Sequence, residues 1–201
     1  MSLPKEYLKN PLFVFALEME SDGKFTSFQT VHTGVGKVQA AYALGKAIVK
    51  DRPSLVVNLG SAGSAVYDAG QVVCCKGFVQ RDMDVTPLGI EKYVTPFSDL
   101  SQILKNGIEM KGCPSCICGT GDSFETAHTG EIYDIVDMEA YALALICLRE
   151  DIPFLSLKYI SDGANGAAAK DWGEALKDGA IKLHREITRL FKPEKIEQTI
   201  S

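Results

Sequence analysis

The fold is decided by residues 136–165, which read Val136-Asp-Met-Glu-Ala-Tyr-Ala-Leu-Ala-Leu-Ile-Cys147 and, after a short polar break, Ile152-Pro-Phe-Leu-Ser-Leu-Lys-Tyr-Ile-Ser-Asp-Gly-Ala-Asn165. The first half predicts a helix, because apolar residues recur at helical spacing at Met138, Ala142, Leu145 and Leu148. Asp137 and Glu139 come at the start of this helix, where carboxylates favour the positive end of the helix dipole.

The second half predicts a buried strand over residues 154–160 that is closed by Ser161-Asp162-Gly163. One acid therefore opens a helix and another ends a strand within one compact unit. Acids at the ends of elements can face a ligand, whereas acids in the middle of elements usually face water or a partner. Glu139 and Asp162 are therefore candidate functional residues.

Strands and helices alternate outward from this unit. Apolar runs predict strands over residues 12–17, 55–59, 71–80 and 113–118, and a more alternating run predicts one over 25–32. Helical patterns cover residues 38–50, 98–110 and 171–191. Because most of the strands are apolar throughout, they predict a largely parallel sheet that is covered on both faces. With no internal repeat or linker, the chain predicts a single domain over residues 1–201, with a core over about 12–191.

Small and acidic residues gather where the predicted strands end, and ligands of such sheets bind beyond the carboxyl ends of the strands. Gly60-Ser61-Ala62-Gly63 follows one strand, and small residues there let a ligand approach the backbone N–H groups closely. The acids that come near strand or helix ends are Glu20, Asp122, Glu139 and Asp162. Two carboxyl groups in different environments can have different pKa values, so that one serves as a general acid and the other as a general base. The alternative is that Glu139 and Asp162 only cap an element and form ion pairs.

Composition excludes several classes of protein. The 201 residues carry a net charge of −5 without a cluster of lysine or arginine, which argues against nucleic acid or an acidic membrane surface as a partner. No apolar run is long enough to span a bilayer, and the first ten residues lack the apolar stretch of a signal peptide. We therefore expect a cytoplasmic protein that binds a small molecule.

Known cofactor and nucleophile motifs are missing from the sequence. Gly34-Val-Gly36 lacks the third glycine of a dinucleotide fingerprint, and neither a phosphate loop nor a Gly-x-Ser-x-Gly elbow is present. Cys113-Pro-Ser-Cys116 and Cys118 have metal-like spacing, but no second Cys-x-x-Cys completes a zinc site. We expect no metal site, and we expect Cys116 and Cys118 to pack as small apolar groups on a strand.

Four motifs occur in the order in which one family carries them: Val57-Asn58-Leu59-Gly60-Ser61-Ala62-Gly63, Gly121-Asp122-Ser123-Phe124, Val136-Asp137-Met138-Glu139-Ala140 and Ile160-Ser161-Asp162. With these motifs the chain resembles the nucleoside phosphorylase family, and within it the 5′-methylthioadenosine/S-adenosylhomocysteine nucleosidases, over nearly its whole length. The resemblance implies a three-layer α/β/α sandwich around a mixed, partly barrel-like central sheet. It also implies an N-glycosyl hydrolase that releases adenine from such purine nucleosides, without a metal or an organic cofactor.

The resemblance assigns two catalytic residues. Asp162 matches the acid that protonates or hydrogen-bonds purine N7, and Glu20, more than Glu18, aligns with the acid that activates water. Loss of the base leaves positive charge on the ribose, so an acid on one side and a base on the other suit this chemistry.

The resemblance also implies substrate-binding residues. Glu139 would hold the ribose hydroxyls, Met138 would pack against the sugar and Phe124 would stack on the purine. The complete set of expected substrate-binding residues is Glu139, Met138, Phe124, Ser61, Ser123 and Ser161.

The choice between water and phosphate depends on one position. Phosphorylases of the family carry an arginine shortly before the Gly-Ser motif, where this chain has Asn58, so hydrolysis is favoured; Arg81 is the nearest other arginine. The chain departs from the usual nucleosidases at Lys158, where they have arginine, and at Asp137, where they have glutamate. The segments after Glu20 and Phe124 are also short, which leaves the 5′ specificity open.

Three other functions remain open from the sequence. They are a futalosine hydrolase or another purine nucleosidase, a phosphate-dependent purine nucleoside phosphorylase, and a non-catalytic purine-binding or storage relative. Members of the family are commonly dimers or hexamers in which a neighbour closes the 5′ pocket. We therefore expect a homodimer, with residues 81–97 as a contributor to the contact.

Overall fold

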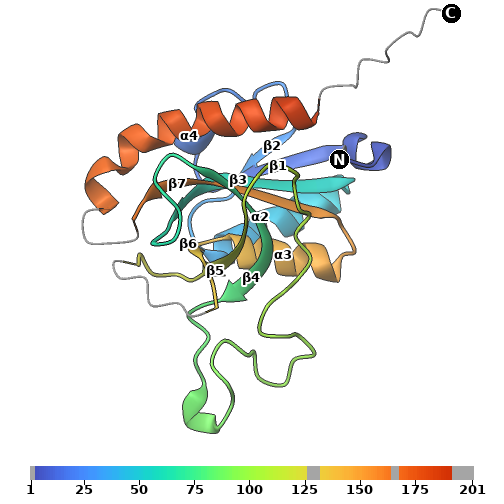
Figure 1. Ribbon diagram of the computed structural model, residues 1–201. Helices are drawn as coiled ribbons and strands as arrows, with labels where there is room; N and C mark the ends of the chain where they lie inside the picture. Colours follow the sequence, from blue (N-terminus) through green and yellow to red (C-terminus); the bar gives the residue numbers. More distant parts are fainter. Residues whose placement is uncertain (1–2, 126–131, 164–167, 192–201) are drawn as a thin grey trace, which may run out of the picture.

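The computed structural model describes residues 3–125, 132–163 and 168–191 (Figure 1). The elements of the first half are η1 (Lys5–Leu8), β1 (Pro11–Phe15), α1 (Glu18–Ser21), β2 (Thr30–His32), α2 (Lys37–Lys50), β3 (Leu55–Gly63), β4 (Val72–Gln80) and η2 (Thr86–Leu88). The elements of the second half are β5 (Ser115–Thr120), β6 (Ile135–Asp137), α3 (Ala140–Arg149), β7 (Phe154–Asp162) and α4 (Ala168–Leu190).

The central sheet is mixed and closes on itself. Its strand order is β2-β1-β3-β6-β5-β4-β7, and β7 pairs back with β3, so five strands form a barrel-like core. The β3–β7, β4–β5 and β5–β6 pairs are parallel, whereas β3–β6 and β4–β7 are antiparallel. The β1–β2 and β1–β3 pairs are also parallel, so five of the seven described strand pairs are parallel. The mixed, partly barrel-like sheet and the largely parallel pairing predicted from the apolar strands are both confirmed. The two antiparallel pairs close the sheet, and their strands are apolar as well because both faces of a closed, covered sheet are buried.

Helices cover the sheet on two sides, as Figure 1 shows, with α2 and α3 on one side and α4 on the other. Strand β1 supplies both apolar layers, because successive side chains point to opposite faces. Leu12 and Val14 belong to the apolar cluster that includes α2 and α3 residues. Phe13 belongs to the cluster that includes Leu183 and Ile187 of α4. This arrangement is the predicted three-layer α/β/α sandwich.

The helix predicted over residues 98–110 is wrong. This segment instead makes isolated β-bridges, from Leu104 to Phe78 and from Gly107 to Phe154. A Cβ atom built at Gly107 would lie 2.2 Å from the carbonyl oxygen of Cys75, so only glycine lets the segment approach β4 this closely. Packing against the closed sheet therefore overrides the local helical pattern.

Several predicted boundaries also move. Strand β1 ends at Phe15, and the two acids that follow lie in the short helix α1, where Glu20 is buried and Glu18 is exposed. The strand predicted over residues 25–32 shrinks to β2. Strand β3 continues through Gly63, so the Gly-Ser-Ala-Gly motif is part of the strand. The helix predicted from the start of the 136–147 stretch begins only at Ala140, because β6 precedes it.

The predicted apolar packing of Cys116 and Cys118 is confirmed. All six cysteines are free thiols, and Cys116 and Cys118 are buried in the same apolar cluster. Within residues 3–125, 132–163 and 168–191, no group of three His, Cys, Asp or Glu side chains could hold a metal ion. In the same described residues, no helix is both long and apolar enough to cross a membrane.

Candidate active site

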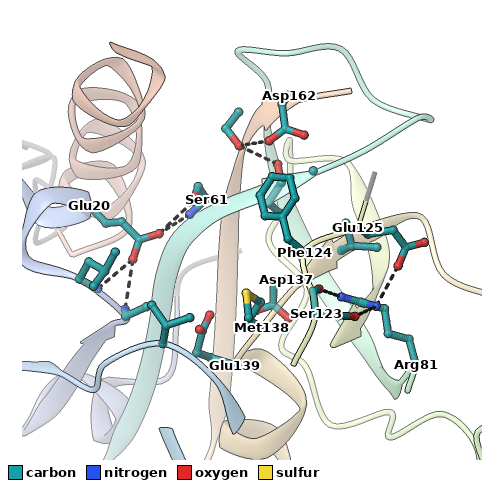
Figure 2. A pocket seen from close by; sticks show the side chains of 17 residues that line it. Glu20, Ser61, Arg81, Ser123, Phe124, Glu125, Asp137, Met138, Glu139 and Asp162 are labelled. Atoms are coloured by element: carbon teal, nitrogen blue, oxygen red, sulfur yellow. Dashed lines mark hydrogen bonds and ion pairs between the residues drawn. The ribbon is translucent and has the colours of Figure 1, made fainter. Parts of the chain in front are cut away.

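A cavity of about 310 Å³ opens where the carboxyl ends of β1, β3, β5, β6 and β7 meet. This volume suits a small-molecule site. All eight residues that the sequence assigns to substrate chemistry line the cavity: Glu20, Ser61, Ser123, Phe124, Met138, Glu139, Ser161 and Asp162. They come from five separate strand ends, and Figure 2 shows how their side chains surround the cavity. Asp122, the remaining acid of the predicted set, does not line it.

Glu20 is fixed at one side of the cavity. Its Oε2 accepts the backbone N–H groups of Ala16 at 3.1 Å and Leu17 at 3.2 Å, so the side chain caps the start of α1. Its Oε1 accepts the backbone N–H of Ser61 at 2.9 Å and the Ser61 hydroxyl at 3.0 Å. A Cβ atom at Gly60 would lie 3.0 Å from Oε1, so glycine leaves room for the carboxylate. The carboxylate is therefore held by four donors in one orientation.

Asp162 ends β7 on another wall of the cavity, next to the end of β3. The pairing of β3 with β7 shifts register between Ala62 and Gly63, and such an irregularity re-aims a side chain. The hydroxyl of the buried Ser161 donates to Asp162 Oδ2 at 2.7 Å, and the Ser64 backbone N–H donates to the Asp162 carbonyl at 3.0 Å. The Asp162 side chain is thus held at the cavity rim.

Glu139 lies below these two acids in Figure 2, and its side chain is mostly removed from water. Its Oε1 accepts the backbone N–H of Gly36 at 2.9 Å, which joins the loop before α2 to the cavity. Burial, and then the nearby charge of Asp137, raise the pKa of Glu139 to about 7. The carboxyl is therefore poised between its neutral and charged forms near neutral pH.

A buried ion pair supports the floor of the cavity. The Lys158 ammonium lies 2.9 Å from Asp137 Oδ2, with the side chains 2% and 1% exposed. Asp137 also accepts the Thr120 hydroxyl at 2.5 Å and the Ala140 backbone N–H at 2.9 Å. Burial alone would raise the pKa of Asp137, but Lys158 and these hydrogen bonds lower it below its usual value. Asp137 therefore remains a buried anion next to Glu139.

Apolar side chains complete the cavity. Phe124 follows β5 and is 57% exposed, so its ring stands at the mouth rather than in the core. Met138 and Val136 contribute further apolar surface on the β6 side. An exposed aromatic ring beside a half-buried acid offers one flat apolar contact and one polar contact to the same ligand.

The cavity lining also contains residues that the sequence did not assign to the site, and Arg81 and Glu125 are the charged pair among them. Arg81 and Glu125 form an ion pair at 2.9 Å, with the side chains 7% and 11% exposed. They are far apart in the sequence and belong to no shared motif, so only the fold brings them together. The hydroxyl of the predicted substrate residue Ser123 accepts a hydrogen bond from the Arg81 guanidinium at 3.1 Å. Its role in substrate binding stays a prediction.

A closed mixed sheet inside an α/β/α sandwich, with acids around one rim, defines the nucleoside phosphorylase class of fold. The family model of the phosphorylase superfamily matches residues 29–192. The 5′-methylthioadenosine/S-adenosylhomocysteine nucleosidase of Haemophilus influenzae strain PittEE is 32% identical over 181 residues, covering 77% of each chain. The chain therefore belongs to the phosphorylase superfamily.

Solved structures share this fold at low sequence identity. A variant of the Helicobacter pylori 5′-methylthioadenosine/S-adenosylhomocysteine nucleosidase, with 5′-methylthioadenosine in its active site, aligns with a TM-score of 0.81 at 16% identity, covering 90% of this chain and 97% of that one. The futalosine hydrolase of the same organism aligns with a TM-score of 0.79 at 16% identity, covering 91% and 99%.

Proposed function

We propose that this protein is a purine nucleosidase that hydrolyses the N-ribosidic bond of 5′-methylthioadenosine- and S-adenosylhomocysteine-type nucleosides and releases adenine. The observation that carries the proposal is the placement of Glu20 and Asp162 on different walls of one cavity, which Glu139 also lines. Hydrolysis of a ribosidic bond requires an acid at the leaving base and a base at the attacking water. The name of the Haemophilus influenzae relative points to the same reaction.

The purine half of the substrate is assigned to the wall formed by Asp162 and Phe124. Asp162 donates a proton or a hydrogen bond to purine N7, so that the electron pair of the breaking C1′–N9 bond is accepted by a neutral leaving base. The hydroxyl of Ser161 orients the carboxyl for this transfer. The ring of Phe124 stacks on the base and keeps N7 against the acid.

The ribose is assigned to Glu139 and Met138. As the base departs, positive charge develops on the sugar, and Asp137 and the ionised form of Glu139 line the cavity in which it forms. An ionised Glu139 accepts hydrogen bonds from the ribose hydroxyls better than a neutral one does. Because the pKa of Glu139 is about 7, substrate binding should strengthen as the pH rises through this value.

The water is assigned to Glu20. Three of the four hydrogen bonds to its carboxylate come from backbone N–H groups, and only the Ser61 hydroxyl can rotate away. Oε1, which the hydroxyl contacts, is therefore where a water can be deprotonated. The water oxygen bonds to C1′ while its proton passes to Glu20.

The scarcity of basic side chains in the described cavity lining favours water over phosphate as the nucleophile. Among the described residues that line the cavity, Arg81 is the only lysine or arginine, and its guanidinium already pairs with Glu125 and Ser123. Asn58, at the position where phosphorylases carry arginine, is buried and accepts the Ser156 hydroxyl at 3.0 Å instead of facing the cavity. A phosphate dianion would therefore find no uncommitted cation in this lining.

We infer a homodimer located in the cytoplasm. Helix α2 exposes an apolar stripe formed by Val38, Tyr42 and Val49, which are 77%, 65% and 90% exposed. Phe97, in the segment expected to meet a partner, is fully exposed. Such surfaces commonly become buried between subunits. Light scattering after size-exclusion chromatography tests the dimer.

The cytoplasmic location is supported by the free cysteines, because thiols stay reduced in that compartment.

The test is release of purine base from 5′-methylthioadenosine, S-adenosylhomocysteine and futalosine, measured with and without added phosphate. We expect adenine release from the first two nucleosides at a rate that ignores phosphate. Release that requires phosphate would replace the proposal by a phosphorylase. Cleavage of futalosine alone would assign a different nucleosidase, and no release from any of them would leave a non-catalytic purine-binding protein.

A further inference from the structure

We propose that Arg81 is a positioning residue that holds the turn of residues 121–125 so that Phe124 is ready to stack on the purine. This inference rests on the proposed function, because it assumes that the base binds against Phe124. Arg81 lies directly after β4, and the turn follows β5, the parallel neighbour of β4. The side chain therefore reaches the turn across two adjacent strand ends (Figure 2).

The Arg81 guanidinium contacts the turn on both sides of Phe124. On the near side its Nη2 donates to the carbonyl oxygens of Gly121, at 3.4 Å, and of Ser123. Its Nη1 donates to the Ser123 hydroxyl at 3.1 Å and, on the far side, pairs with Glu125 at 2.9 Å. One planar fork thus fixes three of the five residues of the turn.

The packing of the turn is built around this side chain. A Cβ atom at Gly121 would lie 2.9 Å from Cζ of Arg81, so glycine lets the guanidinium lie flat on the backbone. Within the described residues, Arg81 Nε is buried and has no hydrogen-bond partner. An unsatisfied buried donor is unfavourable, so the other contacts of the guanidinium with the turn must offset this cost.

Asp82, the residue after Arg81, also holds the turn of residues 121–125. Asp82 accepts the Asp122 backbone N–H at 2.9 Å and pairs with the Lys37 ammonium at 2.5 Å. The Lys37 backbone N–H donates to Asp122 Oδ1 at 2.8 Å, so the turn is also tied to the start of α2. These contacts fix the backbone on either side of Phe124 and leave its ring at the cavity mouth. A ring that is ordered before binding loses less conformational entropy when the base arrives.

Arg81→Lys tests the inference, because an ammonium can pair with Glu125 but cannot span both carbonyls and the hydroxyl. We expect the dissociation constant of adenine, measured by calorimetry, to rise about 10-fold, and KM for 5′-methylthioadenosine to rise similarly. The kcat should change less than about threefold, since Arg81 does not touch the reacting atoms. Arg52→Lys is the matched control, because Arg52 pairs with Glu150 on the surface outside the cavity lining.

A double-mutant cycle separates positioning from a general loss of structure. In a Phe124→Ala background, Arg81→Lys should weaken adenine binding less than about twofold, because the ring through which it acts is gone. An equal loss in both backgrounds, a loss in kcat with unchanged KM, or no effect would overturn the inference. If Arg81→Lys does not fold, Glu125→Gln carries the same test, with a smaller rise expected in the same direction.

The two proposals fail separately in this experiment. Wild-type protein that binds adenine but cleaves no nucleoside would overturn the proposed function, while the binding cycle would still decide the role of Arg81. Wild-type protein that binds neither adenine nor hypoxanthine would overturn the inference, since Phe124 would then have no base to stack on.

Discussion

Replacing Glu139 by glutamine should stabilise the protein above neutral pH and weaken its activity. Glu139 is 8% exposed, and its pKa is about 7 rather than the ordinary 4.5. This difference corresponds to roughly 3 kcal/mol of unfavourable free energy when the carboxyl is ionised in the native state. Glutamine is uncharged at every pH and keeps an acceptor oxygen for the Gly36 N–H.

The sign of the pH dependence follows from proton binding. Below about pH 4.5 the Glu139 carboxyl is protonated in both the folded and the unfolded chain, so its burial does not lower the free energy of unfolding through ionisation. Between pH 4.5 and 7 the unfolded chain loses the proton first, and the free energy of unfolding of the wild type falls as the pH rises. Above pH 7 the full penalty of roughly 3 kcal/mol remains.

Urea unfolding, followed by circular dichroism between pH 5 and 8.5, measures the effect. Glu139→Gln should gain little over the wild type at pH 5 and roughly 3 kcal/mol at pH 8. Glu150→Gln, at an exposed acid paired with Arg52, should show no comparable trend. The kcat/KM of Glu139→Gln should fall, because a neutral amide holds ribose hydroxyls less well than a carboxylate. A stability difference that does not grow with pH would refute the reasoning.

Three further predictions concern the acid, the base and the cavity floor. Asp162→Asn should lower purine release about 10²–10⁴-fold without changing the thermal unfolding midpoint, and an undiminished rate would exclude Asp162 as the acid. Gly60→Ala should lower kcat at least about 10-fold, because the added methyl displaces Glu20, whereas Gly45→Ala, which meets no atom within 4 Å, should leave kcat unchanged. Lys158→Met should cost about 3–5 kcal/mol in urea unfolding, because it leaves a buried carboxylate unpaired, and a loss below about 1 kcal/mol would contradict the buried ion pair.

Sequence patterns correctly predicted the helices and strands whose formation depends mainly on residues close together in the sequence. The alanine-rich helix over residues 38–50 matches α2 within one residue, and the apolar strand over 71–80 matches β4 equally well. The closure of the sheet could not be predicted in this way, because the pairing of β7 with both β3 and β4 depends on residues distant in the sequence. The false helix over residues 98–110 has the same origin, since Gly107 packs against β4 in an environment that its neighbours do not encode.

The site residues likewise fall into those found in short sequence motifs and those brought together only by the fold. Residues in short motifs at strand ends, such as Glu139 and Asp162, could be proposed from the sequence, and the fold places them around one cavity. The supporting contacts could not be proposed. Lys158 and Asp137 stand out in the sequence only as departures from a family pattern, yet they form a buried pair beneath the site. Arg81 reaches its partners across 40 residues or more, a distance at which side-chain pairing leaves no pattern in a single sequence.

The most direct test of the proposed hydrolysis is the identity of the sugar product formed from 5′-methylthioadenosine in phosphate buffer. Phosphorus NMR detects a sugar 1-phosphate, and a reducing-sugar assay detects the free sugar. Attack by water activated at Glu20 predicts one equivalent of free reducing sugar per adenine and no sugar phosphate. A sugar 1-phosphate formed in step with adenine would contradict this account, because phosphate rather than water would then be the nucleophile.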